Sequence, residues 1–165
     1  MLYSSQEFKL ARCRKLNYAE IAKIARDYFN EKFQFASDFL LGARYYAGLQ
    51  KYKMASFHLH QAAENYLRTI PLVYILYGYK DHALEILMDR CKTHTLQLVS
   101  VFPRNTEEER RLFNLLQDAY VQARYNKDFV VTKTDIDALI PRLELMRDIT
   151  EKVCCDRIAY YEQQS

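Results

Sequence analysis

The stretch from Ala55 to Pro71, ASFHLHQAAENYLRTIP, constrains the fold more than any other part of the chain. In a helix, at about 100° per residue, its small and apolar side chains would gather into one stripe. The stripe consists of Tyr52, Ala55, Leu59, Ala62, Ala63, Tyr66, Ile70 and Val73. The pattern therefore predicts a central, buried helix that neighbouring helices approach closely. Polar side chains border the stripe: His58, Gln61 and Asn65 beyond one edge, His60 and Glu64 beyond the other.

The composition favours an all-α protein made of one domain. The chain has 165 residues, of which 50% are hydrophobic and 27% charged, and it contains only three glycines and three prolines. This excludes collagen-like, disordered and turn-rich sandwich proteins, because those classes need more glycine, proline or charge. The longest apolar runs, residues 70–79 and 96–102, are too short to span a membrane. A net charge of +3 is well below that of a dedicated DNA-binding protein, so any contact with a nucleotide or nucleic acid is expected to be local.

The cysteines predict a cytoplasmic protein with reduced thiols. There are four, Cys13, Cys91, Cys154 and Cys155, and the adjacent pair would point in different directions on a helix. No C-x-x-C motif occurs, so we expect no metal site and no cofactor.

Local capping patterns predict where the helices begin and end. Serine, threonine, asparagine and aspartate cap helix N-termini, and glycine often follows a helix C-terminus. A weakly amphipathic helix is expected up to Leu16, followed by a helix from Tyr18 to about Lys51 that is either continuous or broken near Asn30. The central helix would end at Gly78. Further caps are expected at Asp81 for a helix over residues 82–90, at Asn105 or Thr106, and at Thr132 for a long last helix that Pro141 kinks.

Three consecutive segments together resemble the HEPN domain, named for higher eukaryotes and prokaryotes nucleotide-binding. They are FHLHQAAENYL, YGYKDHALEIL and VFPRNTEEERRLFNLLQDAYVQARYNKDFVVTK, followed by a terminal amphipathic helix. The resemblance covers residues 38–157 and is greatest to the bacterial branch found C-terminal to a nucleotidyltransferase domain. It implies an up-and-down bundle of about five helices over residues 38–160, preceded by a helical extension or linker over residues 1–37. It also implies a homodimer, a possible nucleotidyltransferase partner, and a place in toxin–antitoxin or RNA-processing systems.

The resemblance also implies a polar cleft between the central helix and the helix that ends in an arginine. The ribonuclease branch carries an arginine followed, after four to six residues, by a histidine. Arg124 matches the arginine, but Phe129, Val130 and Val131 occupy the positions where the histidine would fall. We therefore expect nucleotide or RNA binding without catalysis. The residues predicted to hold the ligand are Arg124, Asn126, Lys127, His82, Glu64 and Asn65.

Two other functions fit the same residues. One is a metal-independent endoribonuclease toxin that uses Arg124 with a displaced histidine, and the other is a purely structural dimerisation module. Several residues also have a plainer explanation. Arg124 suits a helix C-terminus, His82 could cap the bundle, and His60 and Glu64 could bond to each other on the surface. The 14 tyrosines could stack on bases, but most are expected in the core or at a dimer seam.

Overall fold

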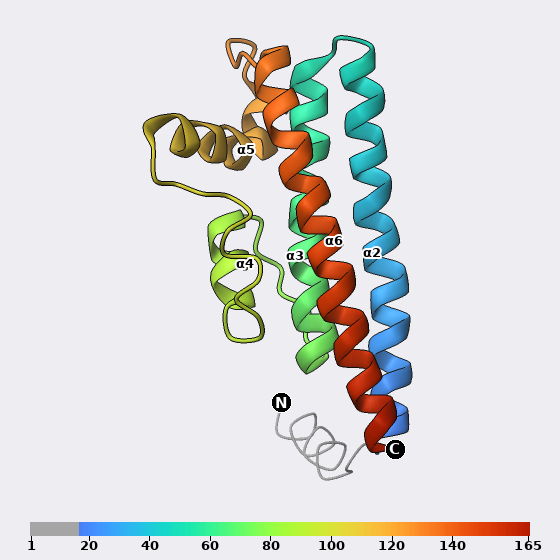
Figure 1. The fold of residues 1–165 in the computed structure, drawn as a ribbon. Coiled ribbons are helices and arrows are strands. Elements are labelled where there is room, and N and C mark those ends of the chain that lie inside the picture. The colour runs from blue at the N-terminus through green and yellow to red at the C-terminus, as the bar shows by residue number, and fades with distance from the viewer. Residues whose placement is uncertain (1–16) are drawn as a thin grey trace, which may run out of the picture.

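The computed structural model describes residues 17–165, which form five helices and no strand. These are α2 (Tyr18–Gly48), α3 (Tyr52–Ile75), α4 (Leu84–Cys91), α5 (Glu107–Tyr125) and α6 (Lys133–Gln164), labelled as in Figure 1. The all-α fold predicted from the sequence is confirmed. No helix in this part of the chain is both long and apolar enough to cross a membrane.

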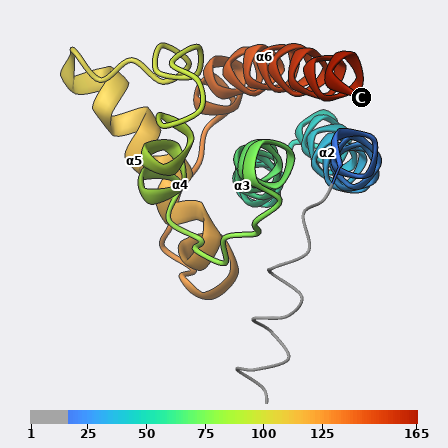
Figure 2. The same cartoon turned by 90° about the horizontal axis from the view of Figure 1, so that it is seen from below.

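Three long helices, α2, α3 and α6, lie side by side and form the body of the molecule (Figures 1 and 2). The short α4 and the crosswise α5 pack on the side of α3 that faces away from α2. As a result, α3 contacts all four other helices. Residues 62–67 of α3 are buried all round, so the predicted central helix is confirmed.

Three helices begin with a capping box, in which the cap side chain and a side chain three residues later each bond the other's backbone N–H. In α2, the Asn17 side chain accepts from the Glu20 amide at 2.8 Å. The same reciprocal bonds join Thr106 to Glu109 and Thr132 to Asp135. The helix starts at residues 18, 107 and 133 therefore follow from local sequence, as predicted.

The end of α3 and the start of α4 differ from the prediction. Leu76, not Gly78, is the left-handed residue that ends α3, with φ of 54°, and its partly buried side chain packs on the core. Asp81 does not cap α4, because its carboxylate binds Arg90 at 3.3 Å instead. Helix α4 begins at Leu84 with no side-chain cap. Residues 76–83 thus form a linker without regular secondary structure between α3 and α4.

The remaining predictions about the helices have mixed outcomes. Of the two alternatives for α2, the structure shows one continuous helix, within which the predicted boundary between residues 37 and 38 falls. Helix α6 continues through Pro141. In the α5–α6 loop the side chain of Val131 is buried, whereas that of Val130 is exposed. The helix predicted up to Leu16 and Cys13 lie outside the described residues.

The three cysteines of the described chain are free thiols. Cys91 and Cys154 are buried, and burial raises the pKa of the Cys91 thiol to about 12. A thiol with so high a pKa carries almost no thiolate at neutral pH, so Cys91 acts as a small packed side chain.

Candidate functional site

A buried carboxylate on α3 organises the polar side chains around it. Glu64 is only 2% exposed, and a buried charge is tolerated where partners satisfy it. One of its oxygens lies 3.2 Å from Arg68 Nη1, one turn further along α3, and the other lies 2.8 Å from His82 Nδ1. Glu64 therefore connects the linker before α4 to the central helix α3.

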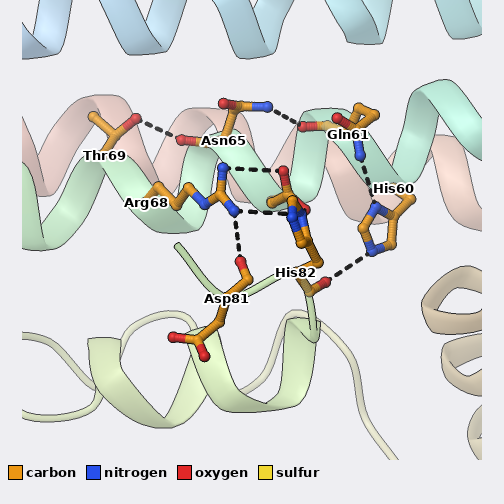
Figure 3. Close-up of polar contacts among 8 residues, drawn as sticks. His60, Gln61, Asn65, Arg68, Thr69, Asp81 and His82 are labelled. Carbon is orange, nitrogen blue, oxygen red and sulfur yellow. Dashed lines mark hydrogen bonds and ion pairs between the residues drawn. The ribbon is translucent and has the colours of Figure 1, made fainter. Parts of the chain in front are cut away.

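Two more side chains of α3 hold the backbone of the same linker. Arg68 Nη2 donates to the carbonyl of Asp81 at 2.6 Å, and His60 Nε2 donates to the carbonyl of His82 at 3.1 Å. Figure 3 shows both carbonyls turned toward α3. The position of His82 is thus fixed by bonds to its side chain, to its own carbonyl and to the preceding residue.

His60 is fully buried and neutral. Burial lowers its pKa to about 4, the bond to the His82 carbonyl opposes this only in part, and the guanidinium groups of Arg68 and Arg124 lower the pKa further. Its Nδ1 faces the side-chain amide of Gln61 at 3.2 Å, so the proton lies on Nε2, which faces the carbonyl. The predicted surface bond between His60 and Glu64 is wrong, because both residues are buried and each is bound to the linker instead.

His82 reaches solvent although its backbone is fixed. Its side chain is 50% exposed. Because the Glu64 carboxylate accepts from Nδ1, the proton of a neutral His82 lies there and Nε2 keeps its lone pair. The ring also stacks on Tyr120 of α5, with centroids 4.5 Å apart and an interplanar angle of 13°. This gives an oriented imidazole beside an aromatic face.

Arg124, in the last turn of α5, lies against the same tyrosine. Its guanidinium carbon is 4.5 Å from the Tyr120 ring centroid, 4.9 Å from that of Tyr125 and 5.2 Å from that of Phe57. Its Nε donates to the Tyr120 carbonyl at 2.7 Å. Arg124 is exposed, and it contacts no carboxylate in the part of the chain that the structure describes. Its remaining donors are therefore available to an anion.

The other predicted ligand-binding residues are placed differently. Asn126 and Lys127 follow Arg124 and are exposed, and Asn126 bonds Gln122 at 2.7 Å and the Asp128 amide at 2.9 Å. Asn65 is buried, donates to the Gln61 carbonyl at 2.8 Å, and lies on the opposite side of α3 from His82 (Figure 3). The structure therefore brings Glu64, His82 and Arg124 together, places Asn126 and Lys127 nearby, and separates Asn65 from them.

Tyr120, Phe57 and Arg68 complete this cluster but were not predicted as site residues. Arg68 follows Glu64 by one helical turn, and this spacing could have indicated the ion pair. Tyr120 was indicated only as one of the 14 tyrosines that could stack on bases, because its partners His82 and Arg124 reach it from the linker and from its own helix. An open hollow of about 350 Å³ adjoins the cluster, lined by His82, Gln117, Tyr120 and Val121 among others. Aromatic faces, an oriented imidazole and an unpaired arginine suit a ligand with a planar ring and a phosphate.

Comparisons with known proteins bear on the family of the chain. A search of curated proteins gave no match. The family model of the HEPN domain matches residues 29–153, which is most of the chain and includes every residue of the cluster. This match, which the all-α fold supports, shows that the chain belongs to the HEPN domain family.

Proposed function

We propose that this HEPN domain binds a nucleotide or RNA, with a phosphate at Arg124 and a base or ribose against the His82–Tyr120 side of the cluster. The observation that carries the proposal is the shared contact with Tyr120, because His82 stacks on its ring and the Arg124 guanidinium lies 4.5 Å from its centroid. Both side chains reach solvent. Asn126 and Lys127 lie next to Arg124 and would add polar and positive groups around the phosphate.

Binding without cleavage is the form of this proposal that the loop after Arg124 favours. Residues 129–131 carry apolar side chains where the ribonuclease branch has its histidine. Metal-independent cleavage needs one group that takes the proton of the 2′-hydroxyl and another that stabilises the negative charge on phosphorus. Arg124 suits the second task, and its loop offers no group for the first.

The position of His82 favours a second candidate, a metal-independent ribonuclease. With Nδ1 held 2.8 Å from Glu64, Nε2 could accept the proton of a 2′-hydroxyl. The 2′-oxygen would then attack phosphorus and the 5′-oxygen would leave, taking a proton from water, to give a 2′,3′-cyclic phosphate. Incubating single-stranded RNA with the protein in EDTA distinguishes the two functions. Cleavage that disappears in both His82→Ala and Arg124→Ala would replace the binding proposal, whereas intact RNA agrees with it.

A homodimer and a nucleotidyltransferase partner are further proposals that rest on the resemblance alone, as does a purely structural role in pairing. Sedimentation of the purified chain tests the first, and co-purification with a nucleotidyltransferase encoded beside it tests the second. A stable dimer that binds neither nucleotides nor RNA would favour the structural role.

Fluorescence anisotropy with a labelled short RNA tests the binding proposal. We expect Arg124→Ala to weaken binding by about tenfold or more, since a charge-assisted contact to phosphate contributes roughly 1.5–3 kcal/mol. Arg110→Ala is the matched control, because Arg110 is exposed on the same helix about 21 Å away and its loss changes the net charge equally. Equal effects of the two substitutions would contradict a specific site at Arg124.

A further inference from the structure

Aromatic rings continue from the cluster across α3 and onto the outer face of α2. Tyr120 on α5 is parallel to Phe57 of α3 at 6.4 Å, and Phe57 is 5.8 Å from the ring of His58. His58 in turn lies 4.9 Å from Tyr46 and 5.7 Å from Phe39, both on α2. The outermost members are Tyr45, 5.5 Å from Tyr46, and Phe35, 5.0 Å from Phe39. We call these rings, from His82 to Phe35 and with Tyr125 beside Arg124, the aromatic track.

The ends of the track are open to solvent while its middle is packed. Tyr45 is 63% exposed and Phe35 is 50% exposed, and Tyr125 beside Arg124 is 75% exposed. The rings between them are half-buried and hold one another in place. Packing between the helices explains why the inner rings are present. It does not explain the outer rings, which contribute little to that packing. Ring faces exposed in this way are what stacking on bases requires, because every base has a π-face.

Unpaired positive charges gather where the track crosses from α5 to α3. They belong to Lys51, Lys53, Arg124 and Lys127, none of which forms an ion pair within residues 17–165. Lys53 Nζ donates to the carbonyl of Asn126 at 3.0 Å, which joins the start of α3 to the loop after α5. A polyanion would supply the negative charge that these side chains lack in the chain itself.

We propose that the ligand is a single-stranded nucleic acid several nucleotides long, which runs from Arg124 along the aromatic track onto α2. The inference rests on the proposed function and extends it, because a mononucleotide would occupy only the Arg124 end. Phosphates lie against the four cations, and bases stack on Tyr125, Tyr45 and Phe35. A second copy of the chain is the rival occupant of the α2 face, but an interface between two copies would not need the four unpaired cations beside the track.

The dependence of affinity on oligonucleotide length tests the inference. Labelled RNAs of about 3 and about 12 nucleotides are titrated with the wild-type protein, with Tyr45→Ala and with Phe35→Ala. We expect the wild type to bind the longer RNA more tightly, and each substitution to weaken binding of the longer RNA by about fivefold or more while leaving the shorter one unchanged. Leu41→Ala is the matched control, because Leu41 is an exposed apolar residue of the same helix without a ring. Tyr45→Phe keeps the ring and is expected to bind like the wild type.

Other results overturn the inference, and they are distinguishable from failure of the proposed function. If the short RNA binds through Arg124 but the longer RNA gains nothing, the track is not used and the proposed function stands. If Tyr45→Ala and Phe35→Ala convert a dimer into a monomer in sedimentation without weakening RNA binding, the track is a protein interface. If neither RNA binds, both proposals are wrong.

Discussion

The ionisation of His60 differs between the unfolded chain and the folded protein in the mildly acidic range. Its pKa is about 4 in the fold against 6.5 for a free side chain, chiefly because it is buried. Between these two values the unfolded chain binds a proton that the folded protein does not. The free energy of unfolding should therefore fall as the pH decreases from about 6.5 to about 4, by roughly 3 kcal/mol from this histidine alone.

We expect His60→Gln to flatten this pH dependence. Glutamine cannot be protonated, yet its amide can still donate to the carbonyl of His82. Urea unfolding at about pH 7 and about pH 4.5 measures the change for both proteins, and carboxylates contribute equally to each. The wild type should lose about 2–3 kcal/mol more than the variant. An identical loss would mean that His60 is protonated in the folded protein.

The candidate site residues were predictable only where the sequence marks them locally. Arg124 stands out at the end of a well-defined helix, and Glu64 stands out as a carboxylate beside an apolar stripe. Asn65, the next residue, looked equivalent but bonds the Gln61 carbonyl in the buried interior. The burial of His60 was missed because its partner, the carbonyl of His82, belongs to a linker 22 residues away.

At the scale of the elements, α2 and α3 approach closely at Gly42. A methyl group at this position would lie 2.7 Å from Cδ2 of His58. The imidazole cannot easily move, because its Nδ1 donates to the backbone carbonyl of Met54 at 3.0 Å. The rings of Phe39, Tyr46 and Phe57 also surround it. We expect Gly42→Ala to lower the free energy of unfolding by about 1–3 kcal/mol, even though alanine is the better helix former.

Gly48→Ala provides the control within the same helix. No atom lies within 4 Å of the added methyl group, so this protein should unfold at the same or a slightly higher temperature than the wild type. Thermal unfolding of both variants gives the comparison. Equal melting temperatures would mean that His58 yields and that the helices are not closely packed at Gly42.

The predictions of helix boundaries succeeded where a few adjacent residues decide them. The three capping boxes are complete within four residues each, so their sequences suffice. The linker after α3 was mispredicted because tertiary contacts decide it. Asp81 has the right side chain for a cap, but Arg90 binds it, and Arg68 holds its carbonyl.

On the scale of the whole molecule, the candidate site exists because the linker and α5 both pack on the same side of α3. Helix α3 supplies His60, Glu64 and Arg68, the linker supplies His82, and α5 supplies Tyr120 and Arg124. The fold class was predictable from composition and periodicity. The stacking of His82 on Tyr120 was not, because neither pattern tells which face of the crosswise α5 meets the linker.

Photocrosslinking locates the bound nucleic acid directly and so tests the central claim that the Arg124 cluster is the binding site. A single-stranded RNA that contains thiouridine is irradiated with the full chain, and the modified peptides are identified by mass spectrometry. Adducts are expected on the peptides that contain Tyr120, Tyr125 and His82, and they should diminish in Arg124→Ala. Adducts confined to the N-terminal half of α5 or to the outer face of α6 would contradict the claim.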